Sequence, residues 1–367
     1  MASRNKKRIL ITGAEGYLGS VIAPFLIERG YEVVGLDTGY FKDALLYDLP
    51  PYPVVAKDAR DFSAEDLEEI DVVVHLAGMS INDAFGDLSG EKLYEPSRLY
   101  SRAIADLCKK RGVKFIFASS CSIYGKSGDT VLDERAAVNP QIEYARNKLS
   151  IEEDLKAMAD TSFSPIALRF ATAFGPSPRM RFDIVVNMLT GMAVAENKIV
   201  LNSDGEAWRP NVHVLDIAKA VECAVESSYS GGALLVLNVG RDDNNMKIIE
   251  IARIISEECG GTPISFEISG KRGAKSELVT SSAIRADGSD SRNYRVSFGR
   301  IKEQFPDFVC RYSVREGIKE MIKKFKEIKL TNEQFQNRSF YRIKILEDLY
   351  TRQQIDSDLF WKQHHAV

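Results

Sequence analysis

A short apolar run, Arg8-Ile9-Leu10-Ile11, leads directly into a glycine-rich turn, Thr12-Gly13-Ala14-Glu15-Gly16-Tyr17-Leu18-Gly19, and the residues after it have apolar side chains at helical spacing. A strand, a tight turn and a helix in this order are typical of a unit that binds a dinucleotide at the edge of a parallel sheet. Gly13 would permit the turn, Gly16 would let a pyrophosphate approach the helix, and Gly19 would let helix and strand pack closely. The residues expected to contact such a cofactor here are Gly13, Gly16, Tyr17, Leu18 and Gly19.

A second strand-like run, Tyr31 to Leu36, ends at Asp37. A carboxylate at this place accepts hydrogen bonds from the hydroxyls of a ribose, but it would repel a 2′-phosphate. We therefore expect the cofactor to be NAD rather than NADP, with Asp37 among the residues that bind it.

Apolar runs alternate with segments of helical periodicity along the first half of the chain. The clearest helical segments are 91–112 and 140–160, and the strand-like runs are 8–12, 32–36, 53–56, 71–76, 114–118 and 163–169. Strands that alternate with helices form a parallel sheet covered on both faces. The sequence therefore predicts an α/β fold with a doubly wound parallel sheet of the Rossmann kind, whose carboxyl edge holds the cofactor.

Tyr144 and Lys148, in Tyr144-Ala145-Arg146-Asn147-Lys148, are four residues apart and share one face of a predicted helix. A lysine ammonium near a phenol favours the phenolate, so that a group with an unperturbed pKa of about 10 becomes a base near neutral pH. This pair indicates redox chemistry at a carbon that bears a hydroxyl, with Tyr144 as the acid and base. The competing interpretation is an ordinary helix tyrosine beside a solvated lysine.

Together these residues resemble the extended short-chain dehydrogenase/reductase family, in its branch of nucleotide-sugar epimerases and dehydratases. The resemblance runs from Lys7 to Lys329, and its further motifs are Asp58-Ala59-Arg60-Asp61, His75-Leu76-Ala77-Gly78, Ser119-Ser120-Cys121-Ser122-Ile123-Tyr124-Gly125, Arg169 to Gly175-Pro176, and Arg209 to Asp216. It implies that Ser120 hydrogen-bonds the reacting oxygen and that Lys148 holds the nicotinamide ribose. Ser119 is the adjacent alternative, because strand alternation lets only one of the two serines face the site. The further cofactor contacts implied are Asp58, Ala59, Leu76, Ala77 and Gly78.

The resemblance also implies a smaller α/β domain that caps the substrate and is discontinuous in sequence. The helix His213 to Ser228 and the strand Leu234 to Asn238 would return to the main sheet. The C-terminal segment has a helical apolar pattern and would pack on its own chain or on a partner. The predicted division is a dinucleotide-binding domain, 1–176 and 213–240, a substrate domain, 177–212 and 241–329, and a C-terminal helical extension, 330–367.

The two residues after Ser120 discriminate between reactions of this family. Related 4,6-dehydratases carry an Asp-Glu pair there, because the elimination of water needs a further acid and base, whereas this chain has Cys121-Ser122. Cys121 is also out of register with the acid cysteine of related 3,5-epimerases, whose position is occupied by Ser122. We therefore expect an NAD-dependent nucleotide-sugar epimerase that inverts C4 of a hexose through a 4-keto intermediate. The alternatives are an NAD(P)H-dependent 4-ketosugar reductase, a dehydratase, and a non-catalytic NAD-binding regulator.

Arginines are the expected clamp for the diphosphate of the substrate, because a planar guanidinium donates two parallel hydrogen bonds. Arg209 stands at the family's position, while Arg179, Arg181 and Arg292 compete with an interpretation as plain surface charge. Thr172 replaces an asparagine that the family usually has. The predicted substrate-binding residues are Ser80, Ser120, Cys121, Ser122, Thr172, Arg179, Arg181, Asn187, Arg209 and Arg292.

Composition limits the other classes of function. The net charge of −3 gives no general signal for binding polyanions, so nucleic acid is not an expected partner. No segment approaches the length of a membrane span, and the apolar run after the basic leader Met1–Arg8 is too short for a signal peptide. The five cysteines are scattered and the histidines are few, which predicts reduced thiols in the cytoplasm and no metal site. His75 and His213 are expected to be structural, and a homodimer through 91–112 and 140–160 is expected by analogy.

Overall fold

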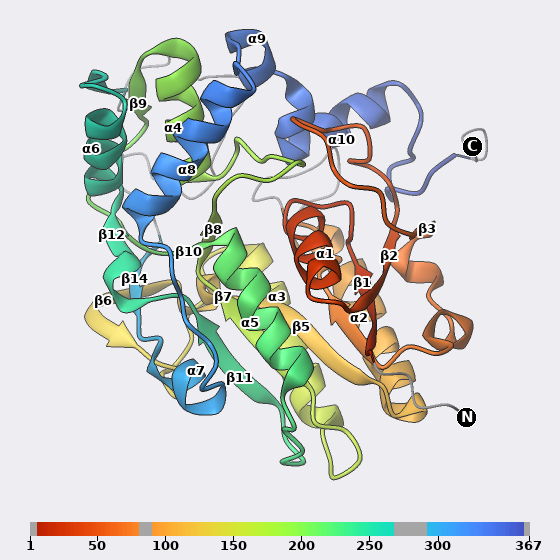
Figure 1. Cartoon of the computed structure of the whole chain (residues 1–367). Coiled ribbons are helices and arrows are strands. Elements are labelled where there is room, and N and C mark those ends of the chain that lie inside the picture. Colours follow the sequence, from red (N-terminus) through yellow and green to blue (C-terminus); the bar gives the residue numbers. More distant parts are fainter. Residues whose placement is uncertain (1–5, 81–89, 268–291, 363–367) are drawn as a thin grey trace.

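The computed structural model describes residues 6–80, 90–267 and 292–362. Its centre is a seven-stranded sheet in the order β11-β7-β5-β4-β1-β2-β3, in which all neighbouring strands are parallel (Figure 1). The direction of winding reverses between β1 and β4, which is where ligands bind in open α/β sheets. The strands are β1 Arg8–Thr12, β2 Glu32–Asp37, β3 Val54–Ala56, β4 Val72–His75, β5 Lys114–Ser120, β7 Ile166–Phe170 and β11 Leu235–Val239.

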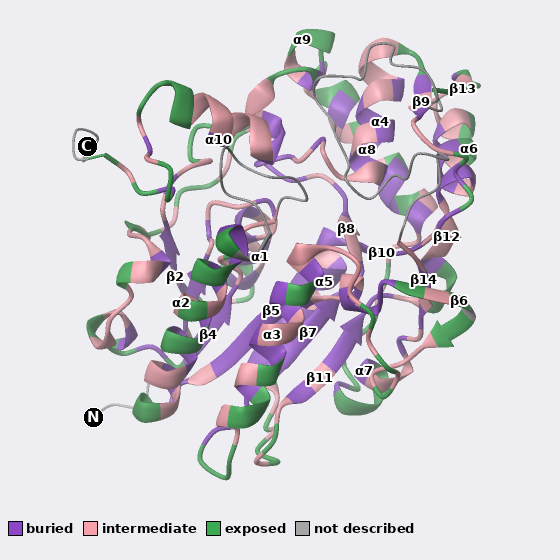
Figure 2. Cartoon of the chain, turned by 180° about the vertical axis from the view of Figure 1, so that it is seen from behind, coloured by how far each residue is buried: buried purple, intermediate pink, exposed green. Residues whose placement is uncertain are grey.

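Helices cover both faces of this sheet, because successive side chains of each strand point to opposite sides. Ile9 and Ile11 of β1 belong to the core beneath α1 (Gly19–Glu28) and α5 (Val214–Glu226). Leu10 belongs to a separate core on the other face, beneath α2 (Gly90–Arg111) and α3 (Glu143–Met158). Figure 1 shows α1 and α5 in front of the sheet, and Figure 2 shows the same sheet from behind, with its strands largely buried.

A second core lies beyond the carboxyl edge of the sheet. Its aromatic centre is Phe182, whose ring contacts those of Phe325, Phe335, Phe340 and Tyr341. The elements around it are α4 Val185–Glu196, α6 Ile248–Glu258, α8 Val314–Glu327, and the strands β8 Thr172–Phe174, β9 Ile199–Leu201, β10 Trp208–His213, β12 Asn245–Lys247 and β13 Ile264–Phe266. Beside the main sheet lie β6 Lys126–Leu132, β14 Asn293–Val296 and α7 Gly299–Gln304.

The C-terminal segment packs on its own chain, which is one of the two arrangements predicted for it. After α8 it forms α9 (Asn332–Phe335) and α10 (Arg342–Thr351), and α10 lies above the loop that follows β2 (Figure 1). Leu346 is buried there, as its place in the helical pattern predicts. Phe340 lies in the turn before α10 and is buried in the second core instead.

The elements agree with the sequence pattern to within a few residues, so the α/β fold with a doubly wound parallel sheet is confirmed. The proposed domain boundaries remain a prediction, and residues 268–291 of the expected cap, like residues 1–5 of the leader, lie outside the described residues. Within the described residues no helix is both long and apolar enough to cross a membrane.

Candidate active site

A cavity of about 780 Å³ runs along the carboxyl edge of the seven-stranded sheet and continues beneath the second core. It is lined by the ends of β1, β2, β4 and β5, so the topology alone brings these segments together. Every residue predicted to contact the cofactor lines this cavity: Gly13, Gly16, Tyr17, Leu18, Gly19, Asp37, Asp58, Ala59, Leu76, Ala77, Gly78, Tyr144 and Lys148.

The glycine turn is constrained by close backbone contacts. Gly13 has φ +73°, and a Cβ on it would lie 2.7 Å from the backbone nitrogen of Ala77, so another residue would not fit. A Cβ on Gly19 would lie 2.5 Å from the carbonyl oxygens of Gly13 and Ala14. Gly19 therefore lets the start of α1 lie close against the backbone that directly follows β1, in line with the role expected for it.

Asp37 lies at the end of β2 and is held by two backbone donors. Its carboxylate accepts hydrogen bonds from Gly39 N at 2.8 Å and from Glu15 N at 3.0 Å. Burial raises the pKa of Asp37 above its ordinary value, and these two hydrogen bonds oppose that rise. An oriented acceptor at this point of the cavity fits the ribose of a dinucleotide.

The residues present therefore fit NAD. The turn and the start of α1 would hold its diphosphate, Asp37 the adenosine ribose, and Lys148 the nicotinamide ribose. A second carboxylate at the adenosine end, Asp58, is partly buried beside Arg60, whose Nε donates to Asp58 Oδ1 at 2.9 Å.

The predicted catalytic residues meet on the cavity wall. The phenol of Tyr144, on α3, faces the hydroxyls of Ser120, at the end of β5, and of Ser80, and the interaction with each of them lowers its pKa. Lys148 lies one turn further along α3, and its Nζ donates to Ala118 O at 2.8 Å. A phenol with hydroxyl partners, facing a cavity beside a buried ammonium, is a suitable proton acceptor for a sugar alcohol.

The electrostatics of this group differ from the sequence prediction. Burial raises the pKa of Tyr144, while Ser120, the charge of Arg181 and Ser80 lower it. Lys148 is not among these causes, since its Nζ lies 5.8 Å from the centre of the tyrosine ring and faces Ala118 O. Burial also lowers the pKa of Lys148 to about 8. The cation that acts on the phenol in this structure is Arg181, which the sequence analysis assigned only to the substrate.

The two adjacent serines have different partners. Ser119 is buried, and its hydroxyl donates to Glu152 Oε1 at 2.5 Å, within an ion pair between Glu152 and Arg169. Ser120 faces Tyr144, and its hydroxyl accepts a hydrogen bond from Ser122 N at 3.2 Å. This arrangement favours Ser120 as the serine that contacts a reacting oxygen.

Cys121 and Ser122, the two residues after Ser120, lie in different surroundings. Cys121 is fully buried in the core and its thiol donates to Arg169 O at 3.1 Å, so the prediction that it lines the substrate site is wrong. Burial also raises the pKa of this thiol, which makes it inert. Ser122 does line the cavity, and its buried hydroxyl has no hydrogen-bond partner among the described residues.

The other predicted substrate residues divide into two groups. Arg179 and Asn187 do not reach the cavity: Arg179 donates to Glu15 Oε1 at 2.9 Å, and Asn187 donates to Tyr17 Oη at 3.1 Å and accepts from Gly175 N. Both therefore support the walls of the site, and their assignment to the substrate is wrong because neither side chain lines the cavity. The residues that do line the cavity are Ser80, Ser120, Ser122, Thr172, Arg181, Arg209 and Arg292.

Arg209 and Arg292 lie together at the second-core end of the cavity. Arg209 Nη1 donates to the carbonyl oxygens of Trp208 and Arg292, and its guanidinium lies 5.9 Å from the centre of the Tyr294 ring. Tyr294 also lines the cavity. Two arginines and an aromatic ring are a suitable setting for a nucleotide diphosphate.

The two internal histidines are structural, as expected. His75 is fully buried and hydrogen-bonded to Thr12 and Ser101, and burial lowers its pKa to about 3. His213 accepts a hydrogen bond from Leu215 N at the start of α5.

Sequence reasoning missed several residues of the site. Asp183 pairs with Arg181 through both carboxylate oxygens, at 2.9 Å each, and lines the cavity. Arg342, from the C-terminal extension, lines it as well. The only signal in the sequence was an arginine inside the apolar run from Phe340 to Leu346, which the helical pattern left unexplained.

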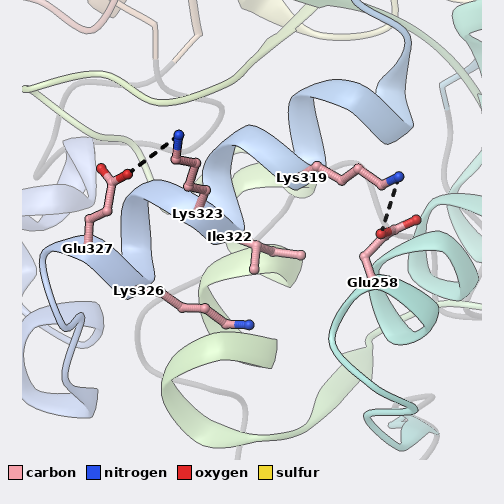
Figure 3. Close-up of a pocket in the computed structure, with 6 residues that line it drawn as sticks. All are labelled: Glu258, Lys319, Ile322, Lys323, Lys326 and Glu327. Atoms are coloured by element: carbon pink, nitrogen blue, oxygen red, sulfur yellow. Dashed lines mark ion pairs between the residues drawn. The ribbon is translucent and has the colours of Figure 1, made fainter.

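A second hollow, of about 560 Å³, lies on the outer face between α6 and α8. Figure 3 shows ion pairs among its charged side chains, Lys319 with Glu258 and Lys323 with Glu327. It contains none of the predicted site residues, so the active site is assigned to the larger cavity.

Comparisons with known proteins agree with this geometry. A model of the NAD dependent epimerase/dehydratase family matches residues 9–240. UDP-glucose 4-epimerase of Corynebacterium glutamicum is 28% identical over 305 residues, which are 75% of this chain and 87% of that protein. The solved structure of TunA, described as an NAD dependent NDP-hexosamine 5,6-dehydratase, has a TM-score of 0.72 at 21% identity and covers 88% of this chain and 98% of its own. UDP-glucuronic acid 4-epimerase from Bacillus cereus, in complex with UDP-glucuronic acid and NAD, has a TM-score of 0.69 at 21% identity over 88% and 99%.

Proposed function

We propose that this chain, which belongs to the NAD dependent epimerase/dehydratase family, is an NAD-dependent epimerase that inverts C4 of a nucleoside diphosphate hexose. The observation that carries the proposal is the Tyr144 phenol, which faces the cavity between Ser120 and Ser80 with Lys148 one helical turn away. The relative from Corynebacterium glutamicum, a UDP-glucose 4-epimerase, supports a UDP-hexose as the first substrate to test.

The proposed reaction transfers one proton and one hydride, and later returns both to the sugar. Tyr144 would take the proton of the sugar O4 hydroxyl, and Ser120 would hold that oxygen by a hydrogen bond. When bound, NAD supplies the acceptor for the hydride from C4 and later returns that hydride. Tyr144 would then give the proton back to the oxygen after the 4-keto sugar has turned its other face to the cofactor. Since cofactor is regenerated in each cycle, the residues that enclose it serve retention rather than exchange.

The wall around the sugar does not favour dehydration. Elimination of water needs an acid and a base beside C5 and C6. The position after Ser120 has Cys121, which is buried in the core, and the next has Ser122, whose hydroxyl faces the cavity. Ser122 would instead hydrogen-bond a hydroxyl of the sugar.

The same proposal includes a homodimer. Helices α2 and α3 lie side by side, and Arg98 on α2 donates to both carboxylate oxygens of Asp154 on α3, at 2.7 and 2.9 Å. Leu99, on the exposed side of α2, is 59% exposed. A second copy of this helix pair would cover such an apolar side chain.

The test is to incubate the protein with UDP-, dTDP-, CDP- and GDP-hexoses and to follow each by proton NMR. The proposal expects the C4 epimer to form to equilibrium with no net consumption of cofactor. Stoichiometric consumption of NADPH by a 4-ketosugar would instead make it a reductase. Formation of a 4-keto-6-deoxy sugar would make it a dehydratase.

A further inference from the structure

The C-terminal extension, which lies outside the matched family segment, forms part of the wall of the cofactor cavity. After α8 the chain folds back over the loop that follows β2. Six of its residues line the cavity: Tyr341, Arg342, Ile343, Asp358, Leu359 and Phe360. A segment that lines the cavity is placed to contact a cofactor or a substrate bound there.

Arg342, the first residue of α10, is the most informative of these. Its side chain is 5% exposed, and its guanidinium lies 3.9 Å from the centre of the Phe41 ring. Neither Nη1 nor Nη2 has a hydrogen-bond partner among the described residues. Buried guanidinium donors without partners are rare, because their desolvation is costly, so this side chain calls for an acceptor that enters the cavity.

The neighbouring carboxylates do not supply that acceptor. Both oxygens of Asp183 accept from the guanidinium of Arg181. From Arg342, Asp183 accepts a hydrogen bond of the backbone nitrogen, at 3.3 Å, and none of the guanidinium. Asp37 accepts from two backbone nitrogens. Arg181 and Arg179 lie close enough to repel the Arg342 cation, and burial lowers its pKa to about 9.

We propose that Arg342 donates to the diphosphate of the bound dinucleotide, so that the C-terminal extension completes the cofactor site. The glycine turn and Asp37 line the same cavity, and that turn is where a dinucleotide places its diphosphate. A phosphate offers the paired acceptors that a planar guanidinium matches. The inference rests on the proposed NAD cofactor and adds a residue that binds it.

The end of the extension closes the adenosine side. Arg60 donates from Nη1 to Asp358 O at 2.6 Å and from Nη2 to Leu359 O at 2.9 Å, and its guanidinium lies 3.3 Å from the centre of the Phe360 ring. Trp361 Nε1 donates to Thr38 O at 2.6 Å, one residue after Asp37. The extension is therefore tied to the two segments that carry Asp37 and Asp58.

The experiment measures NAD affinity on the full-length protein. Wild type, Arg342→Gln, Arg342→Lys and Arg352→Gln are stripped of nucleotide and titrated by calorimetry with NAD and, separately, with NADP. Arg352 is the matched control, because it is an exposed arginine just beyond α10. We expect Arg342→Gln to weaken NAD binding by about 10- to 100-fold, as for loss of a hydrogen bond to a charged group. Arg352→Gln should bind as wild type does, and Arg342→Lys should fall between.

Hydrogen exchange of the wild type with and without NAD tests the same point without any substitution. NAD should protect amides of residues 340–362. The proposal is overturned if Arg342→Gln binds NAD as tightly as Arg352→Gln, or if NAD leaves exchange in this segment unchanged. Weakening that is confined to NADP would overturn it too, because it would assign Arg342 to a 2′-phosphate. If the wild type itself fails to bind NAD, the proposed function fails along with it.

Discussion

Arg181 donates from Nη1 to the hydroxyl of Ser80 at 3.1 Å, and the interaction of Ser80 with the Tyr144 phenol lowers the pKa of that phenol. Asp183 fixes the other side of the same guanidinium. A positive charge is therefore oriented toward the phenol by residues that lie on a segment between β8 and α4. Burial raises the pKa of Tyr144, and the interaction with Ser120, the charge of Arg181 and Ser80 oppose that rise. Since Lys148 faces Ala118 O, Arg181 is the cation among these causes.

Replacement of Tyr144 by phenylalanine tests the acid and base directly. The ring would keep its packing, but the proton acceptor would be lost, so turnover should fall by about 10²- to 10⁴-fold. NAD affinity should stay close to that of the wild type, because phenylalanine fills the same wall. Turnover within a few-fold of the wild type would remove Tyr144 from the mechanism.

The pH profile tests the role of Arg181. A nearby cation and a hydrogen bond to the phenolate both lower the pKa of Tyr144, so removing either raises it. As the pH falls, the phenolate is then protonated at a higher pH than in the wild type. The acidic limb of the plot of kcat against pH should therefore move to higher pH in Arg181→Gln and in Ser80→Ala. A change in KM with an unmoved limb would show that Arg181 contacts only substrate.

The buried ion pair between Arg169 and Glu152 is expected to stabilise the fold around Ser119. Arg169 Nη2 donates to Glu152 Oε2 at 2.6 Å, and the two side chains are 7% and 4% exposed. Glu152→Gln leaves a buried guanidinium without its counter-charge, so it should lower the free energy of unfolding by about 3 to 5 kcal/mol. Glu153→Gln, at an exposed position on the same helix, is the control. Urea denaturation measures both, and equal stability of the two variants would contradict the expectation.

The strands and the cofactor wall were predictable because they follow from local pattern and topology. The runs ending at Leu76 and Ser120 are apolar strands, and parallel strands deliver their carboxyl ends to one edge. Cys121 was misassigned because the chain turns into a short helix after Ser120, which rotates that side chain into the core. Arg342 could not be found this way, because its nearest polar contact, Asp183, is 159 residues away in sequence.

The proposed dimer gives the last prediction. Leu99 projects from α2 with 59% of its surface exposed, and α2 packs against α3 on its other side. A charge at this position would be buried without a partner in a helix pair formed by two copies, so Leu99→Glu should weaken association. Val309→Glu, at a residue 58% exposed outside these helices, should leave the assembly unchanged. Sedimentation equilibrium of both variants at matched concentrations measures this. A wild type that sediments as a monomer would remove the proposed interface, and a Leu99→Glu variant that stays dimeric would place it elsewhere. Neither result would change the proposed chemistry, because the cavity with Tyr144 and Ser120 lies within one chain.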